Sequence, residues 1–129
     1  MIKLANLITE VSQSQLNQVE KYLDKLWDKV GIDVEFTRHF MDRVNDARNN
    51  KPINTAELIK IYREVYKKYG KQISQLSRGT EIVLRDMDTD INVPVVLQWD
   101  GKELDMVAKT VMRKKNFMTR TRKYSVWLN

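Results

Sequence analysis

Hydrophobic residues recur at three- and four-residue steps through the first thirty positions of the chain, which is the spacing of an amphipathic helix. One stripe consists of Leu16, Val19, Leu23, Leu26, Trp27 and Val30. A similar stripe precedes it and consists of Leu4, Leu7, Ile8 and Val11. The pattern predicts one long helix or two, ending near Gly31, because glycine commonly takes the left-handed conformation that follows a last helical turn.

Two further helices are predicted after residue 35. The buried face of the first consists of Phe36, Phe40, Val44 and Ala47. The segment NNKP should end this helix, since a residue before proline avoids the helical region. The second helix begins with a capping box, in which Asn54 is followed three residues later by Glu57, and it continues to about Gly70.

After Gly79 the hydrophobic period shortens to two, as in strands with one buried face. The segment INVPVVLQW places on one face Val93, Val95, Leu97 and Trp99. Pro94 within this segment indicates either an edge strand or the first turn of the strand, because proline lacks the N–H that a central strand needs. The turn WDGKE then leads to a strand that aligns Leu104, Met106, Ala108, Thr110 and Met112. The last strand is YSVWL, and both Trp99 and Trp127 are expected in the core.

These elements predict one α+β domain over residues 1–129, with N-terminal helices packed on one face of a curved antiparallel sheet of about four strands. The chain contains no cysteine, which excludes disulfides, zinc-thiolate sites and iron-sulfur clusters. Its N-terminus lacks the pattern of a signal peptide, and no run approaches the roughly 20 apolar residues that cross a bilayer. A soluble, cytoplasmic protein without membrane contact is therefore expected.

The net charge of +6 is concentrated near the C-terminus. From Met106 onward there is no acidic residue, and the seven basic residues are Lys109, Arg113, Lys114, Lys115, Arg120, Arg122 and Lys123. A segregated basic cluster attracts polyanions, because each neutralised phosphate releases condensed counterions. The alternative is a solvated sheet edge on which lysine and arginine prevent strand pairing.

His39 is the only histidine, and Arg43 follows it by four residues. On a helix the two side chains project side by side at the border of the buried stripe, with Asp46 on the same flank. Such a half-solvated position suits a histidine that transfers protons near neutral pH. A hydrogen-bonding or capping role for His39 is the alternative.

Several kinds of site are not visible in the sequence. The segment DMDTD resembles a calcium loop but lacks its glycine and distal glutamate, and there is no HExxH motif or carboxylate cluster at metal spacing. Glycine-rich phosphate loops and serine nucleophile elbows are also absent. No metal or cofactor is therefore expected.

Cleavage of RNA through its own 2′-hydroxyl needs only a base, an acid and cations around the phosphate, with hydroxyl donors such as Thr110, Thr119 and Thr121 in support.

Four segments together resemble the phage-associated nuclease domains of the barnase, EndoU, colicin and RelE-like (BECR) group. They are HFMDRVNDARNNKPINTAELIKIY, EIVLRDMDTDINVPVVLQWD, LDMVAKTVMRKKNFMT and YSVWL. The resemblance covers residues 36 to 128, so that residues 1–35 form a helical extension of a nuclease-like core. His39 and Arg43 match the histidine and arginine on the helix of that group. The late pattern T-x-x-R-K-x-x-F-x-T is matched by Thr110, Arg113, Lys114, Phe117 and Thr119.

The resemblance implies a metal-independent endoribonuclease of phage or mobile-element type, toxin-like and acting in the host cytoplasm, whose product ends in a 2′,3′-cyclic phosphate. The catalytic residues that it implies are His39, Arg43, Thr110, Lys114 and Thr119. Nucleic-acid contacts are expected from Lys109, Arg113, Lys115, Phe117, Arg120, Arg122 and Lys123. Glu81, Glu103 and Lys109 remain open as the second acid or base.

A different class of function remains open. A noncatalytic module would use the same basic residues to bind nucleic acid, or would act as a structural or interaction protein of a phage. In that case the N-terminal helix would contact a protein partner.

Overall fold

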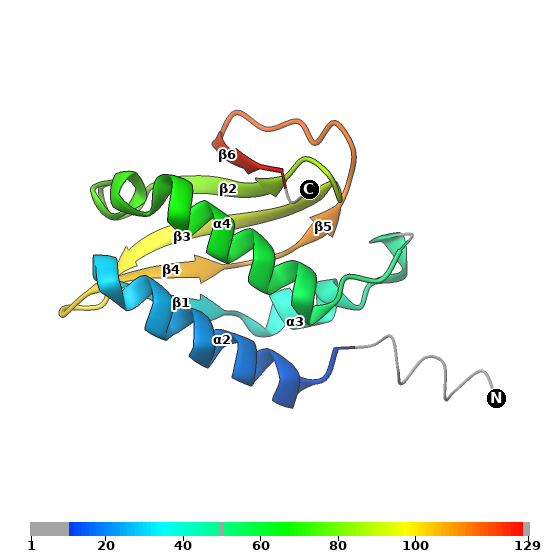
Figure 1. Cartoon of the computed structure of the whole chain (residues 1–129), viewed down its shortest axis with the longest axis horizontal. Helices are drawn as coiled ribbons and strands as arrows, with labels where there is room; N and C mark the ends of the chain where they lie inside the picture. Colours follow the sequence, from blue (N-terminus) through cyan, green and yellow to red (C-terminus); the bar gives the residue numbers. More distant parts are fainter. Residues whose placement is uncertain (1–10, 50, 128–129) are drawn as a thin grey trace.

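Two long helices lie across one face of a mixed six-stranded sheet in the computed structural model, which describes residues 11–49 and 51–127 (Figure 1). The helices are α2 (Gln13–Trp27), α3 (Arg38–Val44) and α4 (Thr55–Ser74), with short 3-10 turns at Asp28–Val30 and Ala47–Asn49. The strands are β1 (Ile32–Phe36), β2 (Glu81–Asp86), β3 (Ile91–Trp99), β4 (Leu104–Ala108), β5 (Met112–Arg113) and β6 (Arg122–Val126). The α+β class is therefore confirmed.

The sheet is mixed, so the prediction of an antiparallel sheet of about four strands was wrong. The strand order is β1-β4-β3-β2-β6, and β5 pairs with β3. The hairpin-linked strands β2, β3 and β4 are antiparallel, whereas β1 runs parallel to β4 and β6 runs parallel to β2. The two outer strands reach the sheet through long connections rather than tight turns, which permits parallel pairing.

Local signals define the two long helices. Ser12 forms a capping box with Gln15 at the start of α2, and Asn54 forms the predicted one with Glu57 at the start of α4. Gly31 has a φ of 77° and follows the 3-10 turn at the end of α2, as predicted. Helix α4 continues past Gly70 to Ser74.

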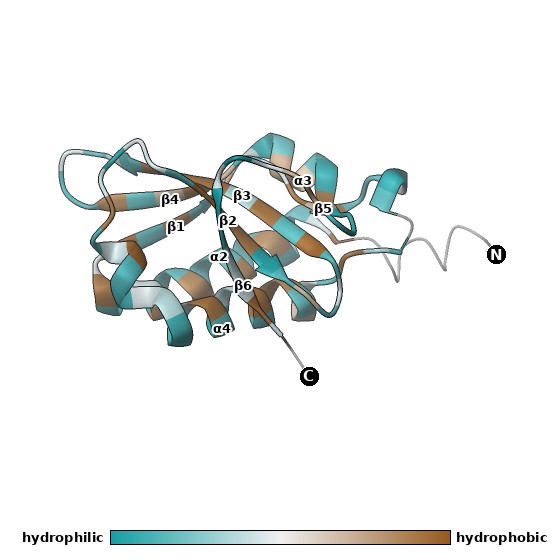
Figure 2. Cartoon of the chain, turned by 90° about the horizontal axis from the view of Figure 1, so that it is seen from above, coloured by the Kyte–Doolittle hydropathy of each residue, from teal (hydrophilic) through white to brown (hydrophobic). Residues whose placement is uncertain are grey.

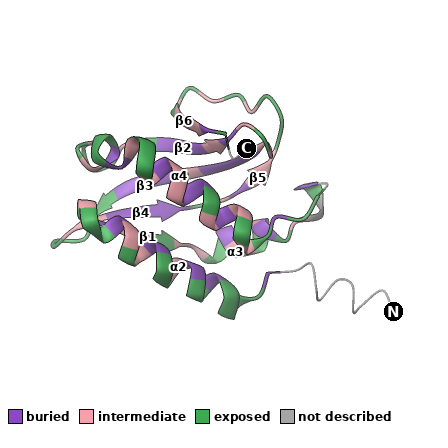
Figure 3. Ribbon diagram, in the orientation of Figure 1, coloured by how far each residue is buried: buried purple, intermediate pink, exposed green. Residues whose placement is uncertain are grey.

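The core lies between the two long helices and the sheet, where the hydrophobic sides of both layers meet (Figures 2 and 3). Helix α2 contributes the buried residues Leu16, Val19, Leu23 and Trp27. These residues belong to the same cluster as the buried faces of α4 and of the central strands. The described part of the predicted N-terminal extension thus packs into this core. In the hydrophobic stripe before residue 12, Val11 is buried. Leu4, Leu7 and Ile8 of that stripe lie outside the described residues.

Strand β1 was not predicted, because Phe36 was assigned to the following helix and is instead the last residue of the strand. The strand lies at the edge of the sheet, and its outward N–H groups are taken by carboxylates of α2. Val34 N donates to Asp24 Oδ1 at 2.6 Å, and Phe36 N donates to Glu20 Oε2 at 2.8 Å. These contacts cover an edge that would otherwise present free donors to another strand.

Pro94 lies in the central strand β3, so its assignment to an edge strand was wrong. The carbonyl of Pro94 accepts a hydrogen bond from Lys109 N at 3.3 Å. The backbone of Pro94 therefore faces the interruption between β4, which ends at Ala108, and β5, which begins at Met112. Because the ladder is broken there, the missing N–H of proline costs no strand pairing.

Trp99 and Trp127 were also predicted wrongly as core residues. They are 51% and 58% exposed, since Trp99 ends β3 and Trp127 follows β6. Thr110 lies in the connection between β4 and β5 rather than in a strand. Within the described ranges, no helix combines the length and apolar character needed to cross a membrane.

Candidate active site

An open cavity of about 720 Å³ lies at the end of the sheet where β1 and β4 terminate. One wall is formed by α3 and the 3-10 turn after it, and the other by residues 110–115. The cavity brings together four of the predicted catalytic residues, His39, Arg43, Thr110 and Lys114, together with the predicted contact residue Lys115. Helix α3 and strand β5 lie at the same end of the sheet in both views of the fold (Figures 1 and 2).

Thr37 fixes the helix that carries the histidine. Its hydroxyl accepts a hydrogen bond from Phe40 N at 3.1 Å and so caps α3, and the hydroxyl also donates to the carbonyl of Lys109 at 3.3 Å. Thr37 N donates to the carbonyl of Ala108 at 3.1 Å. The first turn of α3 is thus attached to the end of β4, and His39 lies within that turn.

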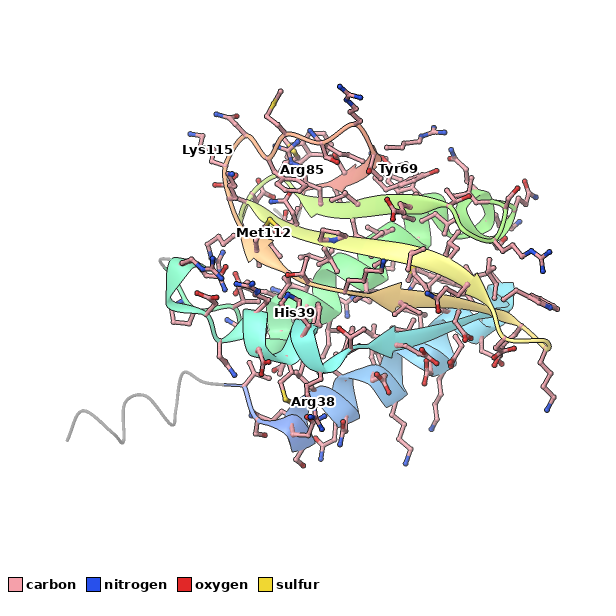
Figure 4. All side chains as sticks on the ribbon, turned by 180° about the vertical axis from the view of Figure 1, so that it is seen from behind. Arg38, His39, Tyr69, Arg85, Met112 and Lys115 are labelled. Atoms are coloured by element: carbon pink, nitrogen blue, oxygen red, sulfur yellow. The ribbon has the colours of Figure 1, made fainter. Side chains whose placement is uncertain are left out.

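His39 and Arg43 form the side-by-side pair expected from their helical spacing. Arg43 Nε donates to His39 Nε2 at 3.1 Å, and Arg43 Nη1 donates to Asp46 Oδ2 at 3.0 Å. In this geometry Nε2 is the ring nitrogen that accepts the hydrogen bond from Arg43. Figure 4 shows His39 on the sheet side of α3, whereas Arg38 projects the other way.

The lining of the cavity is predominantly basic. Among the described residues that line it, the five basic side chains are Arg43, Arg48, Arg113, Lys114 and Lys115, and the one carboxylate is Asp46. Arg48 Nη2 lies 2.8 Å from the Asp46 carboxylate that also binds Arg43, and the Arg48 side chain is 73% exposed. An anion entering the cavity would meet an excess of positive charge.

Two buried asparagines, neither of them predicted from the sequence, position the walls: Asn49 joins one wall to the other, and Asn92 joins the second wall to β3. Asn49 Nδ2 donates to the carbonyl of Arg43 at 2.9 Å, and Asn49 Oδ1 accepts from Arg113 N at 3.1 Å. Asn92 Nδ2 donates to the carbonyl of Lys114 at 3.0 Å, while Lys114 N donates to the carbonyl of Asp90 at 2.8 Å. Neither asparagine belongs to a sequence motif, because one partner of each is distant in the sequence: Arg113 N for Asn49 and the carbonyl of Lys114 for Asn92.

Arg113 was expected to contact nucleic acid, but its guanidinium is engaged inside the protein. Its Nη2 donates to Glu57 at 2.9 and 3.2 Å, and the two side chains are only 10% and 14% exposed. The remaining donors reach the carbonyls of Lys51, Pro52 and Thr89. Arg113 therefore ties β5 to the start of α4 and to the β2–β3 turn.

Three predicted site residues lie on another surface. Lys109, Phe117 and Thr119 line a smaller cavity of about 120 Å³ with Val83 and Val96, on the face of the sheet away from α2 and α4. The residues of the connection between β5 and β6 therefore cover this face, and Thr119 lies outside the cavity that contains His39. Phe117 is half-buried there.

The remaining predicted contact residues are dispersed. The Arg122 guanidinium lies 5.1 Å from the centre of the Tyr124 ring, Lys123 is half-buried in β6, and Arg120 is exposed in the preceding loop. The three candidates for a second acid or base also lie elsewhere. Glu81 and Lys109 line the smaller cavity, and Glu103 belongs to the turn between β3 and β4.

Among the described residues that line the His39 cavity are an imidazole, an arginine hydrogen-bonded to it, a hydroxyl and two exposed lysines. Comparison of the chain with protein-family models, with curated proteins and with solved structures found no match.

Proposed function

We propose that the chain is a metal-independent endoribonuclease of the BECR type, with the His39 cavity as its active site. The observation that carries this proposal is that His39 and Arg43 face Thr110 and Lys114 across one cavity, although about 70 positions separate the two pairs in the sequence. A base, a phosphate clamp, a hydroxyl donor and an ammonium group are the parts that this reaction requires.

In the proposed reaction the phosphate of the substrate draws Arg43 away from His39. His39 Nε2, now released, takes the proton of the ribose 2′-hydroxyl, and the 2′-oxygen attacks phosphorus. The P–O5′ bond breaks, and the 5′-oxygen takes a proton from the Lys114 ammonium or from water. The products are a 2′,3′-cyclic phosphate and a free 5′-hydroxyl. Thr110 and Lys115 stabilise the charge that gathers on the phosphate oxygens.

A noncatalytic nucleic-acid-binding module is the second candidate. It is favoured by the absence of another histidine or a free carboxylate among the described residues that line the cavity. Asp46, the carboxylate present, is hydrogen-bonded to Arg43 and Arg48. A binding module would keep the basic lining and would need no second proton-transfer group.

The two candidates are separated by incubating the purified protein with end-labelled RNA in EDTA. The enzyme should cleave RNA, leave a cyclic phosphate, and spare a substrate with 2′-deoxyribose throughout. His39→Ala should lower the cleavage rate by about 10²- to 10⁴-fold, which is the usual contribution of general base catalysis.

Arg38→Ala is the matched control, because Arg38 is exposed on the same helix and points away from the cavity. Cleavage that persists in His39→Ala would contradict the enzyme assignment. If wild type binds RNA but does not cleave it, the binding module is supported instead.

A further inference from the structure

A group of carboxylates lies along β1, near the start of β4 and in the turn before β4. Asp33 and Glu35 come from β1, Asp105 comes from β4, and Asp100 and Glu103 come from the turn before β4. Single oxygens of Asp33, Glu35 and Asp105 all lie within 4.8 Å of one another. The same holds for Asp100, Glu103 and Asp105, so that Asp105 belongs to both triads.

The parallel pairing of β1 with β4 creates this arrangement. Asp33 and Asp105 are direct partners in the ladder, so two carboxylates face each other across neighbouring strands. Like charges in this position destabilise a sheet. The sequence shows no such cluster, because about 70 residues separate the two strands.

Asp105 is the most buried of these five carboxylates. It is only 7% exposed, and its Oδ1 has no hydrogen-bond partner among the described residues. None of the ion pairs found in the described residues involves any of the five carboxylates. A buried carboxylate oxygen without a donor or cation costs free energy unless something else binds it.

The ionisation of the group agrees with this geometry. Burial, followed by the charges of Glu35, Asp100 and Asp33, raises the pKa of Asp105 to about 6. Burial and neighbouring carboxylates also raise the pKa of Glu35 and of Glu103.

We propose that Asp33, Glu35 and Asp105 bind a divalent cation that prefers oxygen ligands, with Asp100 and Glu103 on its open side. Two ligands at 2.3–2.6 Å from a calcium ion lie at most about 5 Å apart, which accommodates the observed oxygen separations. Magnesium, with ligands near 2.1 Å, requires them to lie within about 4.2 Å. The site contains no histidine or cysteine, so its chemistry favours calcium, magnesium or manganese over zinc.

The proposed cation is structural and is independent of the proposed nuclease activity. Five residues of extended chain, about 16 Å, separate Asp105 from Thr110 in the His39 cavity. The cation would join edge strand β1 to β4 and to the β3–β4 turn. Its removal should therefore affect stability and leave the chemistry at His39 in place.

The test is thermal unfolding of the full-length protein after removal of metal ions, with calcium, magnesium and manganese added separately at constant ionic strength. At about 100 times its dissociation constant, a cation that binds only the folded state should raise Tm by roughly 5–10 °C, with saturation. Asp105→Asn should abolish the saturable rise, and Glu35→Gln should weaken the apparent affinity at least tenfold. The matched control is Asp42→Asn, because Asp42 is an exposed carboxylate on α3, outside the cluster, and its loss should leave the rise unchanged.

A second measurement uses manganese, whose paramagnetism broadens the NMR signals of nearby amides. The amides of residues 33–35 and 100–105 should broaden at the lowest manganese concentrations, before those of residues 110–115, because the broadening falls steeply with distance from the ion. The proposal is overturned if none of the three cations gives a saturable rise in Tm, or if Asp105→Asn retains it. Broadening confined to residues 110–115 would also overturn it.

Discussion

Replacing Arg113 by methionine distinguishes the two roles that sequence and structure assign to this residue. Methionine keeps most of the length of the side chain but removes the charge and all of its donors. If Arg113 contacts nucleic acid, the substitution should weaken RNA binding and leave stability unchanged. If Arg113 instead holds β5 against the start of α4, the free energy of unfolding should fall, and the folded variant should bind RNA as wild type does.

The expected loss of stability follows from the burial of the ion pair. Exposed ion pairs contribute about 0–1 kcal/mol, whereas removing one partner of a buried pair costs about 3–5 kcal/mol. Arg113 and Glu57 are 10% and 14% exposed, which places them in the second class. The substitution also leaves the carbonyls of Lys51, Pro52 and Thr89 without this donor. For a chain of 129 residues, 3–5 kcal/mol corresponds to a fall in Tm of roughly 10–20 °C.

Urea unfolding followed by tryptophan fluorescence measures this loss, because Trp27 is fully buried and reports on the core. Adding Glu57→Gln to Arg113→Met should restore part of the stability, since glutamine removes the unpaired charge and still forms the capping box with Asn54. Lys67→Met is the matched control, because Lys67 is 64% exposed in its pair with Glu64 and should cost less than about 1 kcal/mol. A loss below 1 kcal/mol for Arg113→Met, together with a tenfold loss of RNA affinity, would refute the structural role.

Two further substitutions test the walls of the cavity. Asn49→Ala should lower the free energy of unfolding in urea by about 1–3 kcal/mol, because it leaves Arg113 N without this acceptor and removes one of the donors to the carbonyl of Arg43; unchanged stability would show that the link is dispensable. Lys115→Gln should reduce the slope of log affinity for RNA against log salt concentration by about one, because an exposed lysine that meets a phosphate releases about one counterion. A slope equal to that of wild type would place Lys115 outside the RNA interface.

The parts of the fold that the sequence predicted depend on residues close together in the chain. Asn54 and Glu57 form a capping box within one turn, and Gly31 ends the first helical segment through its own backbone conformation. The pairing of His39 with Arg43 follows in the same way from a spacing of four residues on a helix. These features need no information about distant segments.

The parts that could not be predicted depend on pairing between distant segments. Strand β1 is recognisable only once its partner β4 is known, and Pro94 fits a central strand only because the neighbouring ladder is interrupted. Arg113 and Lys114 are adjacent basic residues in the sequence, yet the first binds Glu57 and the second is exposed at the cavity. A sequence motif does not show which of two neighbouring side chains turns inward.

The distribution of charge along β4 determines how an anion meets this surface. Basic side chains gather beyond the end of the strand, whereas the buried carboxylate Asp105 lies near its start, about 16 Å from Thr110 along an extended chain. At physiological ionic strength the Debye length is about 8 Å, so Asp105 lies about two screening lengths from Thr110. Asp105 therefore does not cancel the field at the His39 cavity. The net charge of the chain does not predict where ions bind, because an ion responds mainly to the charged side chains within a few screening lengths of it. In the two proposals, a phosphate backbone binds beyond the end of β4 and a divalent cation binds near its start, so that neither site needs to weaken the other.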